Sequence, residues 1–299
     1  MTQLLALVEP AFAEAAAFTE ATLDALLPRH GGPEARLHEA MRYATLSGGK
    51  RLRAFFVLQS GRLFGVDRRA LGRVAAAVEC LHAYSLVHDD LPSMDDDDMR
   101  RGKPTLHKAY DEATAILAGD ALHTLAFGLI CSQETHGDPF VRCELVQRLA
   151  AAAGHAGMAG GQMIDLSFEG KTPALPEITR LQRMKTAALI TFCCEAGAIM
   201  GKALANARQA LSAYGQEVGL AYQIADDLLD LEGDAAETGK GVRKDAARGK
   251  ATVVSSLGAE RARAQAEALA AQAVRHLDLF GETADLLRAA ARFVVTRRA

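Results

Sequence analysis

The sequence lacks the signals of several classes of protein. It has five cysteines in 299 residues, and none of them forms a CxxC pair or a zinc-like spacing with the nine histidines. An odd number of cysteines also argues against a disulfide framework. We therefore expect the cysteines to be small, buried hydrophobic residues of a protein in the reducing cytoplasm. They are Cys80, Cys131, Cys143, Cys193 and Cys194.

Neither sign of charge dominates the chain, which has 34 Lys and Arg against 37 Asp and Glu. There is no basic excess of the kind that attracts nucleic acid or an acidic membrane surface. No uncharged apolar stretch approaches the roughly 18 residues needed to cross a bilayer. At the N-terminus, Glu9 and Pro10 interrupt the apolar run and no basic residue precedes it, which argues against a secretory signal. We expect no nucleic-acid partner and no membrane span.

Strand signals are scarce, whereas Ala, Leu, Glu, Arg and Gln dominate nearly every long segment. With 49% hydrophobic residues, the pattern predicts an all-α protein, a large helical bundle. No break in the pattern is long or polar enough for an interdomain linker, so one domain over 1–299 is expected. Helical spacing of apolar residues covers 11–27, 35–47, 51–64, 70–90, 112–131, 140–159, 177–203, 208–231 and about 260 to the end.

Two clusters of aspartate stand in apolar, alanine-rich surroundings, one over 89–98 and one over 226–230. Carboxylates crowded this closely repel one another and cost free energy to bury. Multivalent cations between the clusters would remove that cost. Mg²⁺ is the natural candidate, because it prefers oxygen ligands and is usually shared between a few carboxylates and substrate phosphates.

The second cluster has helical spacing. Asp226 and Asp230 are four residues apart, and Asp227 lies three before Asp230, so a helix presents all three along one side. Gln223 joins that side. A solvated acidic face is the alternative, but the apolar neighbours leave little polar surface there.

The first cluster needs a break in its helix. Asp89 and Asp95 are six residues apart, about 240 degrees on an ideal helix, and would point in different directions. Pro92 disfavours helical geometry at Leu91, so the chain should loop and bring Asp95 back toward Asp89. Asp90 belongs to the same metal set. The later aspartates, Asp96, Asp97 and Asp98, are expected to cap the next turn or to pair with Arg100 and Arg101.

Basic residues beside these clusters suggest phosphate binding. A guanidinium is shaped for bidentate phosphate contact, and two arginines follow the first cluster directly. In Ser47–Arg53, paired glycines precede a helix whose N-terminus would favour an anion, and Lys50 and Arg53 would share a face, unlike Arg51. His82 lies almost on the face of Asp89. One metal-rich and one purely basic site, both opening into an apolar interior, would fit a pair of lipid-like diphosphates.

Five segments carry a family resemblance: GGKRLR, HAYSLVHDDLPSMDDDDMRRGKPT, GGQMIDL, MKTAALI and YQIADDLLD, in that order between about residues 40 and 255. This ordered set resembles the trans-isoprenyl diphosphate synthases, and within them the farnesyl diphosphate synthases of bacteria. The resemblance implies an all-α bundle around a deep central cavity, usually a homodimer. It implies head-to-tail condensation of an allylic diphosphate with isopentenyl diphosphate, with dimethylallyl and geranyl diphosphate as starters.

The resemblance also implies roles for single residues. Three Mg²⁺, with Mn²⁺ as an alternative, would be held on the allylic diphosphate by Asp89, Asp90, Asp95, Asp226, Asp227 and Asp230. Positions that bind the allylic substrate match Arg100, Lys185, Thr186, Gln223, Lys240 and, less closely, Lys250. Positions that hold isopentenyl diphosphate without metal match Lys50, Arg53, His82 and Arg101, with Gly49 permitting close backbone approach. Gln162 and Asp165 match a helix facing the cavity.

The implied reaction is ionisation, condensation and elimination, in which Asp89, Asp90, Asp95, Arg100, Lys185 and Asp226 are the expected catalytic residues. No catalytic triad is required, and the released diphosphate is the expected base. Closure must exclude water that would quench the allylic cation. The growing tail should run along the helix before Asp89, where Tyr84 and Ser85 lie about 6 to 7.5 Å away. A tyrosine there would act as a floor, which favours a C15 product.

Other functions remain open or are excluded by specific residues. Geranyl and geranylgeranyl diphosphate synthases share this chemistry and differ only at the cavity floor. A non-catalytic partner subunit would be expected to have lost one aspartate cluster or the basic pocket. A terpene cyclase would need an Asn-Asp-x-x-Ser motif, but Asn206 is the only asparagine and Ala207 follows it. Neither cluster has the loop spacing of an EF-hand.

Overall fold

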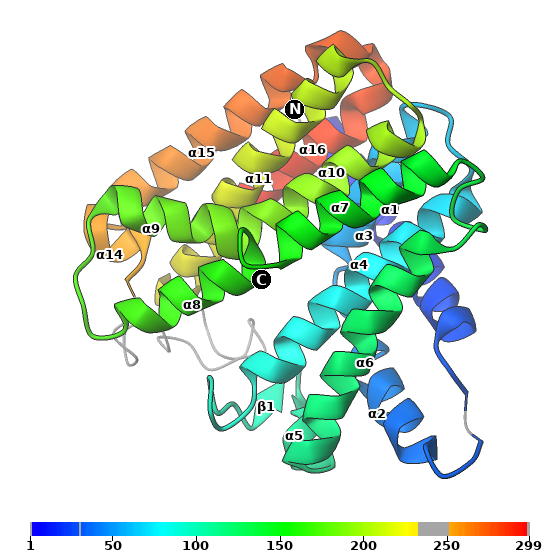
Figure 1. The fold of residues 1–299 in the computed structure, drawn as a ribbon. Coiled ribbons are helices and arrows are strands. Elements are labelled where there is room, and N and C mark those ends of the chain that lie inside the picture. Colours follow the sequence, from blue (N-terminus) through cyan, green and yellow to red (C-terminus); the bar gives the residue numbers. More distant parts are fainter. Residues whose placement is uncertain (1, 30, 233–250, 298–299) are drawn as a thin grey trace. The chain divides into compact units, whose positions relative to one another are not determined.

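The structure is a computed structural model that describes residues 2–29, 31–232 and 251–297. Regular structure in these residues is helical, apart from a hairpin of two short strands (Figure 1). The prediction of an all-α fold is confirmed. The helical elements are α1 (Thr2–Leu26), α2 (Ala35–Thr45), α3 (Leu52–Arg62), α4 (Arg68–Asp89), α5 (Leu106–Ala109), α6 (Glu112–Cys131), α7 (Pro139–Ala153), α8 (Met158–Phe168), α9 (Leu175–Gln182), the π-helical turn η1 (Arg183–Ala187), α10 (Ala188–Met200), α11 (Ala205–Glu232), α14 (Val253–Leu257), α15 (Ala259–His276), the 3-10 turn η2 (Asp278–Ala284) and α16 (Asp285–Thr296). The strands are β1 (Met99–Arg100) and β2 (Lys103–Pro104).

The chain divides into two compact units. The first, here the N-terminal unit, comprises Phe12–Leu58 and Asp67–Val146. The second, the C-terminal unit, comprises Met1–Ala11, Gln59–Val66 and Gln147–Ala299. Each unit has its own buried hydrophobic side chains, so each is described by itself.

The N-terminal unit is organised around α4, which packs against α6. Asp67 caps the start of α4 by accepting hydrogen bonds from the backbone N–H groups of Arg69 and Ala70, both at 3.0 Å. The middle of α4 is buried around nearly its whole circumference. Its C-terminal end lies close to α6, because a Cβ atom added at Gly119 would be 2.1 Å from Nε2 of His88. A side chain at Gly119 would therefore displace the imidazole of His88.

The C-terminal unit is organised around α11, which packs against α10, α15 and η1. Two glycines allow this close approach. A Cβ atom at Gly215 would be 2.6 Å from Cα of Thr191, and one at Gly219 would be 2.5 Å from Cα of Ala187. Tyr214 is fully buried, and its hydroxyl donates a hydrogen bond to the carbonyl of Leu287 in α16 at 2.7 Å.

The structure differs from the predicted elements in several places. The first helix begins at Thr2 rather than at residue 11, and the helix expected from about 260 to the end is divided by the 3-10 turn η2 into α15 and α16. The helix expected over 140–159 ends at Ala153, and α8 begins at Met158, with Gly154 and Gly157 in the break. The helix expected over 177–203 is interrupted by the π-helical turn η1. The hairpin of β1 and β2 was not predicted, because strands of two residues leave no alternating pattern in the sequence.

Two predictions about apolar residues need comment. Cys80, Cys193 and Cys194 are buried as expected, but Cys131 and Cys143 are exposed, so the expectation is wrong for these two. Both α4 and α6 are long and apolar enough to cross a bilayer by length and composition alone, but 67% of the apolar window of α4 and 39% of that of α6 are buried within the protein. Core helices pass the same test, so this is weak evidence for a membrane span.

Candidate functional site

The first aspartate cluster lies on a loop at the C-terminal end of α4. The helix ends at Asp89, just before the Leu91-Pro92 step, as the proline predicts. The chain then turns back, because the backbone N–H of Asp95 donates a 2.7 Å hydrogen bond to the carbonyl of Asp89. A second backbone bond joins the N–H of Asp97 to the carbonyl of Asp90 at 3.3 Å. The predicted return of Asp95 toward Asp89 is therefore confirmed.

Asp90 is buried in this loop and pairs with Arg100. Nε of Arg100 lies 2.9 Å from both carboxylate oxygens of Asp90, and Nη2 lies 2.5 Å from Oδ1. Burial raises the pKa of Asp90, and the hydrogen bond and charge of Arg100 oppose that shift. Burial alone would lower the pKa of Arg100, but Asp90, Asp97 and Asp89 leave that pKa raised. Arg100 therefore stays charged and holds the Asp90 carboxylate in place.

Arg101 occupies the turn between β1 and β2. The strands pair as Met99 with Pro104 and Arg100 with Lys103, so Arg101 and Gly102 form a two-residue hairpin turn. Both turn residues have positive φ, 52° and 74°, as a type I′ turn requires. The turn directs Nη1 of Arg101 to the carbonyl of Gly48.

The neighbouring Gly49 leaves the space that Arg101 needs. Its φ is 127°, which L side chains rarely adopt. A Cβ atom there would be 2.8 Å from Nη1 of Arg101, so the guanidinium fills the space that a side chain would take. The close approach predicted at Gly49 is that of a side chain of the protein itself.

The basic side chains at the start of α3 differ in burial. Arg51 is buried, and its Nη1 bonds to Oε2 of buried Glu79 at 3.0 Å, so Arg51 has a structural role, as its predicted exclusion from the shared face suggests. Lys50 is exposed and precedes α3, which begins at Leu52, so the predicted shared helical face does not extend to Lys50. Arg53 lies in α3 and donates from Nη1 to Nε2 of His82 at 3.2 Å.

His82 is held neutral. Burial lowers its pKa well below 6.5, and the charges of Arg53, Arg101, Arg100 and Arg51 lower it further. Because Arg53 can only donate, Nε2 of His82 accepts and the proton lies on Nδ1. The histidine therefore holds Arg53 in position without adding a charge.

Tyr84 and Ser85 lie one turn before the end of α4. The Tyr84 ring meets the rings of His88 and His123 edge-on, with centroid separations of 5.2 and 4.9 Å. Burial raises the pKa of Tyr84, and the charges of Asp89 and Asp120 add to this. The Ser85 hydroxyl donates to the carbonyl of His82 at 2.8 Å. Tyr84 is thus fixed between α4 and α6.

A pocket opens beside the first cluster within the N-terminal unit. Its empty volume is about 410 Å³, including space open to solvent. The charged residues of its lining are Arg100, Arg101, Lys103 and Asp90, and Ala83, Leu86, Val87 and Leu106 are among its apolar residues. The pocket therefore combines cationic and apolar walls.

In the C-terminal unit, α11 carries the second aspartate cluster, as predicted. Asp227 is buried and accepts hydrogen bonds from two amides, Nε2 of Gln182 at 3.0 Å and Nε2 of Gln223 at 2.8 Å. Asp226 is exposed, and Asp230 is half-buried one turn further along the helix. Asp226 and Asp230 therefore share the more accessible side.

The π-helical turn η1 places Lys185 and Thr186 against this helix. The Thr186 hydroxyl donates to Oε1 of Gln223 at 2.6 Å, which extends the network that holds Asp227. Nζ of Lys185 bonds to Oδ2 of Asp165 in α8 at 2.5 Å. The two predicted residues therefore engage two different helices. Turns of this kind recur at functional sites, but nothing in the sequence marks the extra residue of a π-helical turn.

Gln162 and Arg297 are two further polar residues of the C-terminal unit. Gln162 has a buried side-chain oxygen with no hydrogen-bond partner among the described residues. Nη2 of Arg297 bonds to Oδ1 of Asp226 at 3.0 Å, and its guanidinium lies 4.0 Å from the centroid of the Tyr222 ring. Sequence reasoning missed Arg297, because nothing local relates the end of the chain to α11. Lys240 and Lys250 lie outside the described residues.

The polar groups have the chemistry of a diphosphate site, with carboxylates suited to Mg²⁺ and cations suited to phosphate oxygens. Both oxygens of Asp90 and both of Asp227 already accept hydrogen bonds. Oδ2 of Asp90 and both oxygens of Asp227 each accept one hydrogen bond and keep a second lone pair, so these bonds do not prevent metal binding. The donor set therefore fits Mg²⁺. In the described residues, carboxylate and imidazole ligand atoms also gather at Asp96, Asp98 and His107.

Comparisons with known proteins agree with this chemistry. The sequence model of the polyprenyl synthetase family matches residues 34–286. The chain is 45% identical over 267 residues to a farnesyl diphosphate synthase of Escherichia coli (strain K12), covering 87% of this chain and 88% of the relative. It is 42% identical over 285 residues to the farnesyl diphosphate synthase of Haemophilus influenzae, covering 94% of each.

Solved structures give the same result. An FPP/GFPP synthase from Zymomonas mobilis superposes with a TM-score of 0.88 at 48% identity, covering 98% of this chain and 100% of the other. A geranyltransferase from Helicobacter pylori, complexed with magnesium and isoprenyl diphosphate, gives a TM-score of 0.83 at 32% identity, covering 95% and 94%. Members of this family use Mg²⁺. The chain is an all-α prenyltransferase and belongs to the polyprenyl synthetase family.

Proposed function

We propose that the protein is a farnesyl diphosphate synthase. It condenses isopentenyl diphosphate head to tail with dimethylallyl diphosphate and then with geranyl diphosphate, giving a C15 product. The observation that carries the proposal is the loop after α4, where the turn from Asp89 to Asp95 is followed directly by Arg100 and Arg101. Acidic metal ligands and fixed guanidinium groups within one loop suit a diphosphate that binds with metal.

Six aspartates are proposed to hold Mg²⁺ on the allylic diphosphate. Three ions are expected, with Mn²⁺ as an alternative metal. When bound, Mg²⁺ neutralises the negative charge that develops on the departing diphosphate. Asp90 and Asp227 are kept in fixed orientations by Arg100 and by two glutamines, which supports their role as ordered ligands. The proposed ligands are Asp89, Asp90, Asp95, Asp226, Asp227 and Asp230.

Further residues are proposed to contact the allylic diphosphate. Arg100 is fixed by Asp90 and offers its remaining N–H groups to the diphosphate. Lys185 can turn from Asp165 toward a phosphate oxygen, and Thr186 and Gln223 position Asp227. Lys240 and Lys250 are proposed as further cations. Gln162 and Asp165 are proposed to face the same substrate. Together these groups stabilise the negative charge that develops on the departing diphosphate in the transition state.

A second set is proposed to hold isopentenyl diphosphate without metal. Arg53 and Arg101 are held by His82 and by the Gly48 carbonyl, so both cations are oriented before substrate binds. Lys50 adds an exposed ammonium. A neutral His82 adds no charge to the site and acts by holding Arg53 in position. The released diphosphate is proposed as the base that takes the proton in the last step.

Tyr84, fixed between α4 and α6, is proposed as the floor for the tail, with Ser85 beside it. Geranyl and geranylgeranyl diphosphate synthases are the alternatives with the same chemistry. A non-catalytic partner subunit is a more distant alternative. The name of the Zymomonas mobilis relative covers two products, FPP and GFPP, so a longer product is a specific competitor.

Assembly and location follow from the same family. We expect a cytoplasmic homodimer, and a single functional domain over 1–299, because the family model spans parts of both compact units. Expected partners are isopentenyl diphosphate and the allylic diphosphates, without nucleic acid.

The test is an incubation of purified protein with Mg²⁺, radiolabelled isopentenyl diphosphate and either dimethylallyl or geranyl diphosphate. Product chain length is read by chromatography. The proposal expects a C15 product from both starters, and no product after chelation of Mg²⁺. A C10 or C20 product would keep the reaction and change the length assignment. No metal-dependent product from any starter would contradict the proposal.

A further inference from the structure

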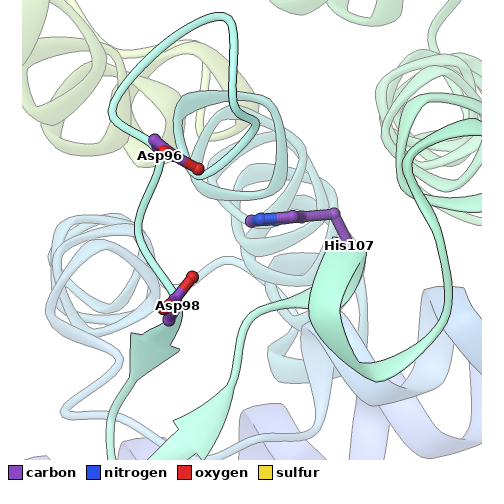
Figure 2. Close-up of side chains that lie close together, drawn as sticks. All are labelled: Asp96, Asp98 and His107. Atoms are coloured by element: carbon purple, nitrogen blue, oxygen red, sulfur yellow. The ribbon is translucent and has the colours of Figure 1, made fainter.

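Asp96, Asp98 and His107 form a separate group of ligand atoms in the N-terminal unit. One ligand atom of each lies within 4.8 Å of those of the other two. None of the three belongs to the ligand set proposed for Mg²⁺. Figure 2 shows the His107 imidazole pointing from α5 toward the loop that carries the two aspartates, with both carboxylates turned toward the space in front of the ring.

His107 is buried, with 7% of its surface exposed. Nδ1 lies 3.2 Å from the Thr105 hydroxyl, whereas Nε2 is buried without a hydrogen-bond partner among the described residues. A buried polar atom left in this state costs about 1–3 kcal/mol. The position of Nε2 therefore needs an explanation.

The hydrogen bonds of Thr105 decide which nitrogen carries the proton. The Thr105 hydroxyl donates to the carbonyl of Asp98 at 3.3 Å. A hydroxyl has one hydrogen, so in the contact with His107 the Thr105 oxygen accepts a hydrogen bond from the N–H at Nδ1. Nε2 then carries a lone pair directed at the carboxylates. A histidine fixed by a hydrogen bond from its other nitrogen is the usual form of a metal ligand.

The two aspartates can supply the remaining ligands. Asp96 and Asp98 are exposed, so their side chains can rotate and bring the carboxylates closer to an ion. In a zinc site with bonds of about 2.0–2.2 Å, ligand atoms are roughly 3.4 Å apart. The ligand atoms of Asp96, Asp98 and His107 lie within 4.8 Å of one another, so a small movement brings them to that separation. The backbone is already set, because Asp96 has a φ of 48° and the Asp98 carbonyl accepts the N–H of Thr105 at 2.9 Å.

Lys108 is the competitor for this space. Its Nζ lies 2.9 Å from Oδ1 of Asp98, and its hydrogen bond to Asp98 raises the pKa of Lys108, with further contributions from the charges of Asp98, Asp96 and Glu112. The pair is largely exposed, so it holds Asp98 weakly. The second oxygen of Asp98 is left for another cation.

We propose that Asp96, Asp98 and His107 bind one divalent transition-metal cation of the Zn²⁺, Co²⁺ or Mn²⁺ class. One imidazole nitrogen and two carboxylate oxygens suit these ions, with water in the open positions. Mg²⁺ prefers oxygen ligands throughout, so the imidazole separates this site from the all-carboxylate sets. The ion would tie the loop after α4 to α5 and restrain the segment that leads from Asp95 to Arg100.

The experiment titrates Co²⁺ into the full-length protein in a large excess of Mg²⁺, which occupies the all-oxygen sites. Visible absorption of the bound Co²⁺ and isothermal titration calorimetry report binding. We expect one equivalent to bind in the wild type. Affinity should fall roughly tenfold or more in His107→Gln and in Asp98→Asn. Lys108→Ala should bind more tightly than the wild type, because it removes the competing ammonium.

Two controls keep the test decisive. His155→Gln removes an exposed histidine of the C-terminal unit and should bind Co²⁺ like the wild type. Asp98→Asn changes an exposed side chain, so it tests the site even where His107→Gln disturbs folding. Zn²⁺ should also raise the melting temperature of the wild type more than that of Asp98→Asn. Equal Co²⁺ affinity in the wild type, His107→Gln and Asp98→Asn, or complete displacement by Mg²⁺, would overturn the proposal.

Discussion

At the scale of single residues, Arg297 affects the second aspartate cluster most directly. Its guanidinium bonds to Asp226 at 3.0 Å and lies over the ring of Tyr222. The guanidinium therefore competes with a metal ion for the carboxylate of Asp226, a proposed metal ligand. The side chain of Arg297 is 6% exposed, but that of Asp226 is 55% exposed, and an ion pair with a solvated carboxylate contributes about 0.2–1 kcal/mol. Arg297→Gln should therefore tighten Mg²⁺ binding by up to about fivefold, measured by calorimetry on the substrate-free protein.

Arg263→Gln is the matched control for this variant. Arg263 pairs with Glu232 at the end of the same helix, α11, at 2.5 Å, and Glu232 is not a proposed ligand. Removing it takes the same charge from the protein and should leave Mg²⁺ affinity within the error of the wild type. Equal changes in both variants would mean that only net charge matters, and weaker binding in Arg297→Gln would mean that the guanidinium does not compete with the metal.

His82 predicts a pH dependence of stability. Its pKa in the folded protein is lowered well below 6.5, first by burial and then by the neighbouring arginines. The unfolded chain, with a histidine pKa near 6.5, takes up a proton that the folded protein refuses. As the pH falls below about 6.5, stability should decrease, by no more than about 1.4 kcal/mol per pH unit, until the folded pKa is reached.

Urea unfolding of the wild type and His82→Gln at pH 7.5 and 5.5 measures this effect. The glutamine keeps an acceptor for Arg53 but cannot be protonated, so His82→Gln should lose less stability between the two pH values. His155→Gln is the control, because it removes an exposed histidine and should behave like the wild type. An equal loss in the wild type and His82→Gln would exclude His82 as the source.

The sequence predicts the position of a residue where neighbouring residues along the chain determine it. Pro92 is enough to predict the return of Asp95 toward Asp89, because its ring restricts the residue directly before it. The pairs of Asp90 with Arg100 and of Asp226 with Arg297 join residues whose spacing follows no helical period. They depend on tertiary structure, so no pattern in the sequence indicates them.

At the scale of elements, the segment before α3 and the hairpin of β1 and β2 act together. Gly48 and Gly49 both have positive φ, 77° and 127°, but only a side chain at Gly49 would meet Arg101. Gly49→Ala should therefore displace the guanidinium of Arg101 and raise the KM for isopentenyl diphosphate. The backbone strain in either alanine variant costs of the order of 1–3 kcal/mol of stability.

Gly48→Ala separates strain from steric displacement, since nothing lies within 4 Å of a Cβ atom at that position. Steady-state kinetics with isopentenyl diphosphate varied, together with thermal unfolding, compares the two variants. Both should lose stability, but only Gly49→Ala should show a large rise in KM for isopentenyl diphosphate. Equal rises would show that backbone conformation, not the space left for Arg101, controls this substrate.

Elements differ in how well the sequence predicts them. Long helices such as α4, α6 and α11 are found to within a few residues, because their apolar spacing extends over several turns. The hairpin and η1 are missed, since each depends on a few residues whose conformation is set by packing. In η1, the close contact of Gly219 with Ala187 is one such constraint, and only the folded C-terminal unit reveals it.

At the scale of the whole molecule, the all-α class and the family follow from composition and from five ordered motifs, whereas product length does not. It depends on the volume beside α4 and α6, and no single motif determines a volume. The Tyr84 ring is placed there by edge-on contacts with His88 and His123. The His88 imidazole, which the Tyr84 ring meets edge-on, lies in turn against Gly119 of α6.

Tyr84→Ala should therefore lengthen the products, because it removes the ring that would stop a growing tail while leaving the helices in contact at Gly119. With geranyl diphosphate as the starter, we expect the variant to form C20 beside C15, as measured by chromatography of the dephosphorylated products. Tyr110→Ala is the control, because Tyr110 lies at the end of α5 against Tyr43 and should keep the wild-type product. A folded, active Tyr84→Ala enzyme that makes only C15 would show that another residue limits the tail.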